Sequence, residues 1–398
     1  MFSIFRVMRK ARNAFGSRGL RALVGMPVLA MTLAACDPAL MQAPTAAPTS
    51  SGAGKPVNVA LLVPGGSANP GDALIARNLE NAARLAIADL AGAKINLTVY
   101  NTAGNAAQAS QVATQAVAEG AQVILGPLFS EAANAAGVAA AASGVNVLSF
   151  SNNTSIAGGN VFVLGNTFNN SADRLVNYAR KQGKKRVHIV HARNVAGETG
   201  RAAIQQALVN AGVNLNGTTS YDFSQQGVIN AVGTVSAAAR TADAIILTSD
   251  AAGALPLFAQ LLPEAGLNPS RVQYMGLTRW DIPQIMQLPG IQGGWFVLPD
   301  PGRVTSFTNR YQTAYGNAPH PLAGLAYDGI AAIGAISASG KAINGSTLTQ
   351  GQGFQGTGGI FRLRANGTNQ RGVAVATVTG GQLQILDPAP QSFGFGGS

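Results

Sequence analysis

From residue 55 onward, short runs of β-branched and aliphatic residues alternate with longer alanine-rich stretches whose apolar positions recur every three or four residues. The first run, 57–64, is almost continuously apolar, as expected of a strand that is buried on both faces of a parallel sheet. In the following stretch, 72–91, the apolar residues fall on one face of a helix. This alternation is typical of a parallel sheet whose strands are joined by crossover helices.

The alternation occurs in two series, which together predict two doubly wound α/β units. The first series contains predicted strands at 57–64, 95–100, 122–125 and 145–149 and predicted helices at 72–91, 106–119 and 131–142. The second contains predicted strands at 186–191, 244–248 and 272–275 and predicted helices at 172–182, 198–211, 229–239 and 252–262.

Candidate ligand-binding residues come from the turns that follow the predicted strands. In open parallel sheets, ligands bind outside the carboxyl ends of the strands, where the chain turns into the next helix. These turns are mostly small or hydroxylic, and they supply the candidates Ser67, Ser130, Ser151, Asn153, Thr154, Asp250, Thr278 and Arg279. Their side chains and the N–H groups of helix starts suit a small polar ligand. For each of them, a role as a turn or capping residue only is the alternative.

Catalytic, metal and cofactor sites are not indicated by the sequence. His188 and His191 are three residues apart on one predicted strand and therefore point to opposite faces, whereas His320 lies in a proline-rich turn. The chain has neither a G-x-S-x-G elbow nor a phosphate-binding P-loop. One G-x-G-x-x-G, at 351–356, lacks the preceding strand and the later acid, so we interpret it as a flexible loop. We expect no metal, no cofactor and no enzymatic activity.

The N-terminus has the features of a bacterial lipoprotein signal. Residues 1–21 carry six cations and no acid, and the apolar run that follows, 22–35, ends directly before the only cysteine, Cys36. The run is too short and too interrupted for a stable membrane span. We therefore expect removal of 1–35 and lipidation of Cys36. Each buried methylene contributes about 0.8 kcal/mol, so two or three acyl chains anchor a domain firmly. An ordinary secretory signal with a chance cysteine is the alternative.

The predicted cleavage also changes the charge of the protein. The full chain carries 27 basic and 16 acidic residues, a net charge of +11, whereas the chain without residues 1–35 carries 21 and 16, a net charge of +5. This charge forms no basic stripe, so nucleic-acid binding is not indicated. With a single cysteine, we expect no internal disulfide. Residues 36–54 lack an apolar period and are predicted to be a flexible linker, and 388–398 a disordered tail.

Several segments resemble the leucine-binding, or branched-chain amino-acid receptor, family of type I periplasmic binding proteins. They are VNVALLVPGG (57–66), QVILGPLFS (122–130), VNVLSFSNNTS (145–155) and GTGGIFRLRANG (356–367). Within that superfamily, the order of ILGPLF, SFSNNTSIAGGNVFVLG, GGWFVLPDP and AYDGIAAIGA is most similar to the penicillin-binding protein activator lipoproteins.

The resemblance covers residues 56–387 and implies a type I periplasmic binding fold of two doubly wound parallel-sheet lobes, joined by three crossovers. It implies that the first lobe comprises about 56–165 and 299–360, and the second about 166–298 and 361–387. Closure of the lobes about this hinge is the expected motion.

The resemblance also implies roles for some of the candidate residues. Ser130, Ser151 and either Asn153 or Thr154 match the places that hold the ligand carboxylate in amino-acid receptors. The receptors use two tyrosines at positions that are occupied here by Ala196 and Asp250. The receptor acid that pairs with the ligand's ammonium group aligns near Thr278. The recognition set for a free amino acid is therefore incomplete, although Asp250 is an alternative acid and Arg279 lies nearby.

Two functions follow from these implications. The favoured one is a lipid-anchored, non-enzymatic penicillin-binding protein activator that contacts a peptidoglycan synthase. The alternative is the solute-binding subunit of an ABC importer, which would contact a permease and bind an amino acid or a related small polar solute. Both place the chain in the periplasm, attached through Cys36 to the inner or the outer membrane.

Overall fold

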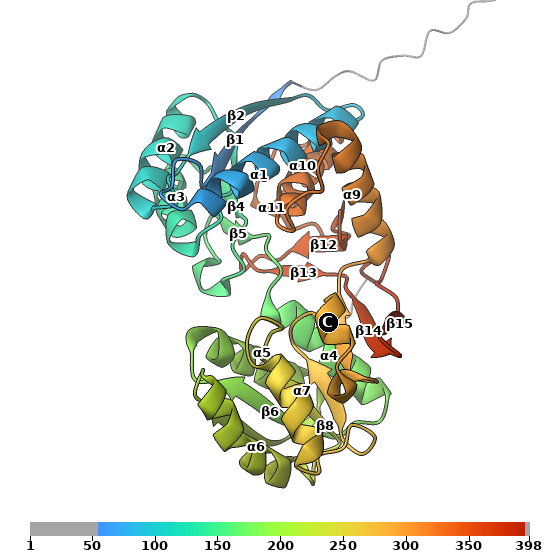
Figure 1. Ribbon diagram of the computed structural model, residues 1–398. Helices are drawn as coiled ribbons and strands as arrows, with labels where there is room; N and C mark the ends of the chain where they lie inside the picture. The colour runs from blue at the N-terminus through green and yellow to red at the C-terminus, as the bar shows by residue number, and fades with distance from the viewer. Residues whose placement is uncertain (1–54, 395–398) are drawn as a thin grey trace, which may run out of the picture. The chain divides into compact units, whose positions relative to one another are not determined.

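The computed structural model describes residues 55–394 (Figure 1). Cys36, the predicted signal 1–35 and the predicted linker 36–54 lie outside the described residues. Within 55–394, no helix combines the length and the apolarity that a membrane span needs.

The first sheet consists of five parallel strands in the order β2-β1-β3-β4-β5. Its strands are β1 (Val57–Val63), β2 (Ile95–Asn101), β3 (Val123–Leu125), β4 (Asn146–Ser149) and β5 (Val161–Val163), and the connecting helices are α1 (Pro70–Asp89), α2 (Ala106–Ala118), α3 (Ser130–Ala141) and the 3₁₀ helix η1 (Thr154–Ile156). All four predicted strands and all three predicted helices of the first series are present. The sequence analysis missed only β5, which has three residues.

The second sheet has seven strands in the order β15-β14-β10-β9-β8-β6-β7. The parallel strands are β6 (Arg186–Ala192), β7 (Asn214–Tyr221), β8 (Ala244–Leu247), β9 (Gln273–Gly276) and β10 (Trp295–Leu298), and β14 (Ala374–Thr379) and β15 (Gln382–Asp387) are antiparallel. Its helices are α4 (Phe168–Lys181), α5 (Val195–Ala211), α6 (Gln225–Ala239), α7 (Leu255–Glu264), the short α8 (Pro283–Met286) and the 3₁₀ helix η2 (Pro289–Ile291). Both sheets thus contain parallel strands in the doubly wound order 2-1-3-4-5.

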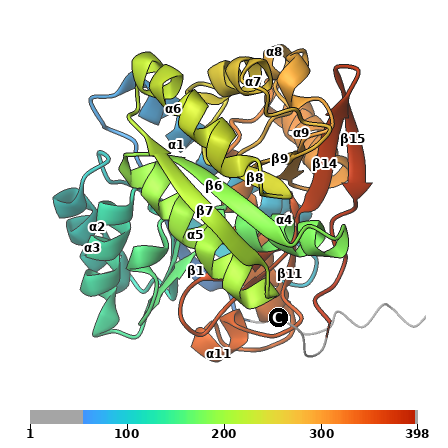
Figure 2. The same cartoon turned by 90° about the horizontal axis from the view of Figure 1, so that it is seen from below.

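Helices cover both faces of each sheet. On the first sheet, α1 packs on one face and α2 and α3 on the other. On the second sheet, α4 and α5 share a hydrophobic cluster with one face, and α6 and α7 share a cluster with the opposite face (Figure 2). The nearly continuous apolar strands of the sequence are explained by this double cover, because both faces of each strand are buried.

A third group of elements completes the first lobe. It comprises α9 (Pro301–Tyr315), α10 (Ala323–Ala338), α11 (Gly345–Leu348) and an antiparallel sheet of β11 (Phe354–Gly356), β12 (Gly359–Leu363) and β13 (Asn369–Arg371). Phe307, Ile330 and Phe361 lie in the same hydrophobic cluster as Leu61 of β1. The motif at 351–356 was predicted to be a flexible loop, but its last three residues form strand β11.

The chain passes between the lobes at 164–167, 298–301 and 371–374, as three crossovers require. The predicted exchange between residues 360 and 361 is wrong, because it falls inside β12. Phe361 and Leu363 fill the core of the first lobe, so the chain leaves that lobe only after Arg371.

Residues 388–394 form neither helix nor strand, but they contact the domain. Ala389 is buried, and the guanidinium of Arg362 lies 4.6 Å from the ring centre of Phe393. The prediction of disorder from residue 388 is therefore wrong for 388–393, because apolar and cation–π contacts hold this segment in place. Residues 395–398 lie outside the described residues.

Candidate functional site

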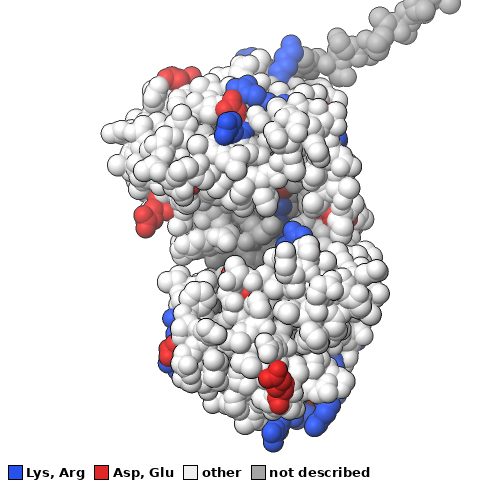
Figure 3. All heavy atoms as spheres, in the orientation of Figure 1, with Lys and Arg blue, Asp and Glu red and all other residues white. Residues whose placement is uncertain are grey.

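A pocket of about 830 Å³ lies at the carboxyl end of the first sheet. It is lined by the turns after β3 and β4, by α9 and α10, by the turn between β11 and β12, and by Arg279 of the second lobe. Figure 3 shows it as a hollow whose visible walls are mostly uncharged. The volume is in the range of small-molecule sites in proteins.

Hydroxyl groups and a helix start meet at one side of the pocket. β3 and β4 are neighbours in the sheet, and the turns after them bring Ser130 and Ser151 to the pocket. Ser130 is the first residue of α3, whose N-cap residue is Phe129, so no side chain caps the first turn of that helix. The backbone N–H groups of an uncapped helix start, together with the helix dipole, favour a negatively charged ligand group.

Four of the eight sequence-predicted residues line the pocket: Ser130, Ser151, Asn153 and Arg279. The buried Ser151 accepts a hydrogen bond at Oγ from the backbone N–H of Asn153 at 3.1 Å. Arg279 binds the carboxylate of Asp281 with two nitrogens, Nε at 2.8 Å and Nη2. This hydrogen bonding raises the pKa of Arg279 above its ordinary value, so its guanidinium stays charged and is paired with the Asp281 carboxylate.

The other four, Ser67, Thr154, Asp250 and Thr278, do not line this pocket. Ser67 accepts a hydrogen bond from the N–H of Asn69 at 3.1 Å, and Thr154 is the first residue of η1. Thr278 donates from Oγ1 to the carbonyl oxygen of Ser249 at 3.0 Å. Asp250 is exposed after β8. Ser67 and Thr278 thus have the turn contacts that formed the alternative interpretation.

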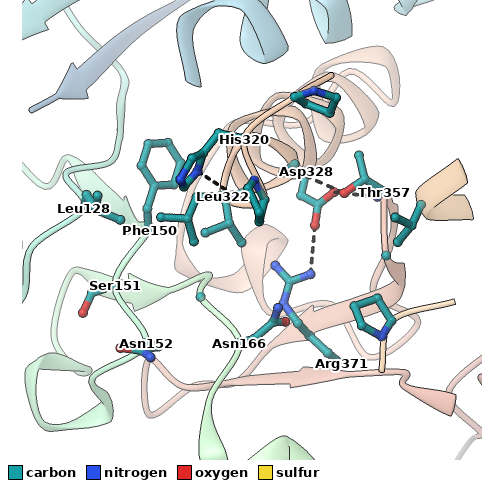
Figure 4. A pocket seen from close by; sticks show the side chains of 18 of the residues that line it. Leu128, Phe150, Ser151, Asn152, Asn166, His320, Leu322, Asp328, Thr357 and Arg371 are labelled. Carbon is teal, nitrogen blue, oxygen red and sulfur yellow. Dashed lines mark hydrogen bonds and ion pairs between the residues drawn. The ribbon is translucent and has the colours of Figure 1, made fainter. Parts of the chain in front are cut away.

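The sequence analysis missed a buried ion pair among the pocket residues (Figure 4). Arg371 Nη1 lies 2.8 Å from Asp328 Oδ2. Asp328 also accepts hydrogen bonds from Thr357, at 2.7 Å from its backbone N–H and at 3.0 Å from its hydroxyl. Arg371 donates in addition from Nε to the carbonyl oxygen of Leu164 at 3.0 Å. Both charges are therefore satisfied within the protein.

An apolar wall with one histidine also went unpredicted. The wall consists of Ile75, Leu128, Phe129, Phe150, Phe307, Leu322 and Leu325. His320 lines the same pocket and accepts a hydrogen bond at Nδ1 from the N–H of Leu322 at 3.2 Å (Figure 4). In the neutral ring, this bond leaves the proton on Nε2, so His320 can act as a hydrogen-bond donor.

Asparagine side chains join two of the crossovers beside the pocket. Asn369 donates from Nδ2 to the carbonyl oxygens of Val163 and Gly165, both at 2.8 Å. Asn170 of α4 donates to Asn369 Oδ1 at 2.6 Å and accepts at Oδ1 from the N–H of Arg371 at 3.0 Å. The first and third crossovers are thus connected by side-chain hydrogen bonds to the second lobe.

The carboxyl end of the second sheet also carries buried polar groups. The buried hydroxyls of Tyr221, at the end of β7, and Ser249, after β8, lie near each other, but within the described residues neither makes a hydrogen bond of good geometry. Burial raises the pKa of Tyr221 to about 12, and the charge of Asp250 contributes to this shift. Unpaired buried hydroxyls are costly, so they are often explained by a ligand, a water molecule or an ion. In the described part of the chain, no three His, Cys, Asp or Glu side chains are grouped as metal ligands would be.

Comparisons with known proteins agree with this architecture. The family model for periplasmic binding proteins matches residues 56–382. A putative branched-chain amino acid ABC transporter protein from Rhodospirillum rubrum is 18% identical, with a TM-score of 0.70 over 83% of this chain and 99% of that one. An ABC transporter substrate-binding protein from Desulfitobacterium hafniense in complex with Leu is also 18% identical, with a TM-score of 0.59 over 83% of this chain and 100% of that one.

A solute-binding protein from Rhodopseudomonas palustris in complex with 3,4-dihydroxybenzoic acid is 19% identical, with a TM-score of 0.56 over 84% of this chain and 98% of that one. At such identities, the similarity establishes the fold alone. No curated protein matches the sequence. Because the family model matches most of its length, the chain belongs to the periplasmic binding protein family, with the type I fold of the leucine-binding members.

Proposed function

We propose that this chain is the solute-binding subunit of an ABC importer and captures a small polar solute in the pocket of the first lobe. The observation that carries the proposal is the meeting of Ser130, Ser151 and the uncapped start of α3 in a pocket of about 830 Å³. Membership of the family implies a periplasmic location. The similar structures of ABC transporter proteins support the importer assignment over a different use of the fold.

Capture would use both lobes. The first-turn N–H groups of α3 and the hydroxyls of Ser130 and Ser151 would hold a polar or anionic group of the solute. On closure, the buried hydroxyls of Tyr221 and Ser249 at the end of the second sheet, which lack a hydrogen bond of good geometry, would gain a ligand partner. A solute that bridges the lobes in this way binds the closed state more tightly and therefore shifts the population toward it.

A thermal-shift screen tests the proposal. All four hydrophobic clusters lie within the part of the chain that the structure describes, so residues 54–398 can be produced without the N-terminal segment. The screen would use amino acids, short peptides, nucleosides, muropeptides and simple carboxylic acids. At a hundred-fold excess over Kd, a ligand stabilises the folded state by about 2.7 kcal/mol, which a melting curve readily detects.

We expect a saturable increase in Tm with one solute class, and we expect Ser130→Ala to abolish it. Val138→Ala is the matched control, because Val138 lies exposed on the same helix outside the pocket. A screen without any shift would overturn the proposal.

Attachment to the membrane through Cys36 is a further part of the proposal. A small-residue cleavage site directly before the only cysteine supports it. Expression of the full chain and of Cys36→Ser, followed by mass spectrometry of the membrane fraction, tests it. We expect an acylated, membrane-bound form of the wild-type protein only. An unmodified wild-type N-terminus or an equally membrane-bound variant would contradict lipidation.

Regulation of a peptidoglycan synthase is the second candidate function. Apolar side chains are exposed after the strands of the second sheet, at the start of α5 and in two turns: Val195 at 86%, Phe223 at 62% and Ile282 at 40%. Exposed apolar side chains of this size suit a protein contact. Direct binding of a purified penicillin-binding protein, weakened by Phe223→Ala but not by Val138→Ala, would support this candidate. Absence of binding to purified synthases would exclude it.

A further inference from the structure

We propose that the solute of the pocket is a carboxylic acid with an apolar, ring-sized body and no ammonium group. The inference rests on the proposed solute-binding function and names the class of solute. It follows from three properties of the pocket walls: the lack of a free carboxylate for an ammonium group, hydrogen-bond donors grouped around the start of α3, and a large apolar surface.

The residues that line this pocket offer no free carboxylate for the ammonium group of an amino acid, and Asp250 of the second lobe is not among them. Among the described residues that line the pocket, Asp328 is the single carboxylate. Its side chain is 1% exposed and already accepts from Arg371 and from both donors of Thr357. An ammonium group would have to compete with the guanidinium of Arg371 for this carboxylate. Burying it without a partner is strongly unfavourable.

Several hydrogen-bond donors line the pocket besides the Asp328–Arg371 pair. The N–H groups at the start of α3, the hydroxyls of Ser130 and Ser151 and Nε2–H of His320 can all donate to a ligand. The hydroxyl of Ser151 already accepts from Asn153, so its own proton is free to donate outward. Donors grouped around a helix start, with no free carboxylate beside them, favour an anion, and a carboxylate is the anion whose two oxygens suit paired donors.

The remaining wall is apolar and includes aromatic rings. Phe150 and Phe307 lie buried behind the surface, whereas Phe129 is 38% exposed beside Ser130. Ile75 and Leu322 are partly exposed in the same pocket. A ligand ring would cover these groups and gain edge-to-face contacts with the phenylalanines. An anion without an apolar body would leave this surface in water.

Two pairs of solutes that differ only in the ammonium group test the inference. They are hydrocinnamate with phenylalanine, and isocaproate with leucine. Each would be titrated calorimetrically into the domain 54–398 at neutral pH. We expect hydrocinnamate to bind at least about ten-fold more tightly than phenylalanine, because only the amino acid brings an unpaired charge. Isocaproate should likewise bind more tightly than leucine.

Two variants distinguish the contribution of the apolar wall to ligand affinity from general effects on folding. Phe129→Ala should weaken hydrocinnamate several-fold, whereas Val138→Ala, a 72% exposed site on α3 outside the pocket, should leave its affinity unchanged. Equal effects of the two substitutions would overturn the placement of the ligand ring. Both residues are exposed in the folded protein, so neither truncation creates a cavity in the core.

The remaining outcomes distinguish the inference from the proposed function. Tighter binding of phenylalanine or leucine would overturn the inference and leave solute capture standing. Asp250→Asn would then show whether Asp250 acts as the ammonium partner. Binding of neither pair, with a different class detected in the thermal-shift screen, would overturn the inference alone. Binding of neither pair and a screen without any shift would overturn both.

Discussion

Asp328 and Arg371 form an ion pair of 2.8 Å at the pocket, with side chains that are only 1% and 7% exposed. Asp328 belongs to α10, and Arg371 is the last residue of β13, directly before the third crossover. Because Arg371 also donates to the carbonyl oxygen of Leu164, it reaches the start of the first crossover as well. The pair thus connects the pocket of the first lobe to two of the segments that join the lobes.

Removal of Arg371 should be strongly destabilising. In Arg371→Met, the buried Asp328 carboxylate loses its counter-charge, and we expect the free energy of unfolding to fall by about 3–5 kcal/mol. Urea denaturation of the domain measures this change. Arg193→Met is the matched control, because the Arg193–Asp222 pair is exposed and contributes less than about 1 kcal/mol. Equal losses in the two variants would show that the buried pair has no special role.

The close approach of β11 to Asp328 gives a second prediction. A Cβ atom on Gly356 would lie 2.7 Å from Asp328 Oδ1, whereas one on Gly351 would meet nothing within 4 Å. Gly356→Ala should therefore destabilise the domain by about 1–3 kcal/mol, as overpacking typically does. Gly351→Ala should be neutral or stabilise it by up to about 1 kcal/mol. Melting curves of both variants check this, and a harmless Gly356→Ala would mean that the carboxylate is free to move.

Most of the fold could be predicted from the sequence because both sheets are covered on both faces. Buried parallel strands such as β1 and β8 have nearly continuous apolar runs, and α1 has one apolar face. β7 gives no such signal, because it is an edge strand with mostly polar and partly exposed residues. The lobe boundary after Arg371 depends on which core Phe361 fills, and this is a property of packing rather than of local pattern.

His188 gives a prediction for the dependence of stability on pH. It is buried on β6, its Nε2 lies 2.9 Å from Thr219 Oγ1, and burial lowers its pKa below the ordinary value of 6.5. The unfolded chain therefore takes up a proton more readily than the folded one. Stability is complete above the unfolded pKa of 6.5 and is lost as the pH falls below it.

Urea midpoints at about pH 7.5 and about pH 5 measure this effect. The wild-type protein should lose more stability over this interval than His188→Gln, because glutamine keeps a polar group for Thr219 but does not titrate. The difference between the two losses of stability isolates the contribution of His188 from that of the carboxylates, which both proteins share. An equal loss of stability in the two proteins between these pH values would contradict the buried, neutral state of His188.

Only part of the candidate site could be predicted from the sequence. Ser130 and Ser151 could be predicted because each follows a recognisable strand of a doubly wound sheet. The pairing of Asp328 with Arg371 joins residues 43 positions apart and leaves no local signal. Phe307 was missed because α9 was not predicted, and His320, although predicted to lie in a proline-rich turn, had no predicted neighbour that would connect it to the pocket.

A local signal for α9 was nevertheless present. Asp300 precedes Pro301, and its Oδ1 caps the helix by accepting from the backbone N–H groups of Gly302 and Arg303. Phe307, Tyr311 and Tyr315 then recur at four-residue spacing, which is typical of one buried helix face. This combination predicts a helix whose buried face includes Phe307.

The central claim is that the pocket of the first lobe binds a solute, and a calorimetric titration tests it most directly. The domain 54–398 would be titrated with the solute that gives the largest shift in the thermal-shift screen, beside Ser130→Ala and Val138→Ala. The account predicts one solute per chain, a loss of affinity of at least about ten-fold in Ser130→Ala, and unchanged affinity in Val138→Ala. Saturable binding that Ser130→Ala leaves intact, or no saturable heat at all, would contradict it.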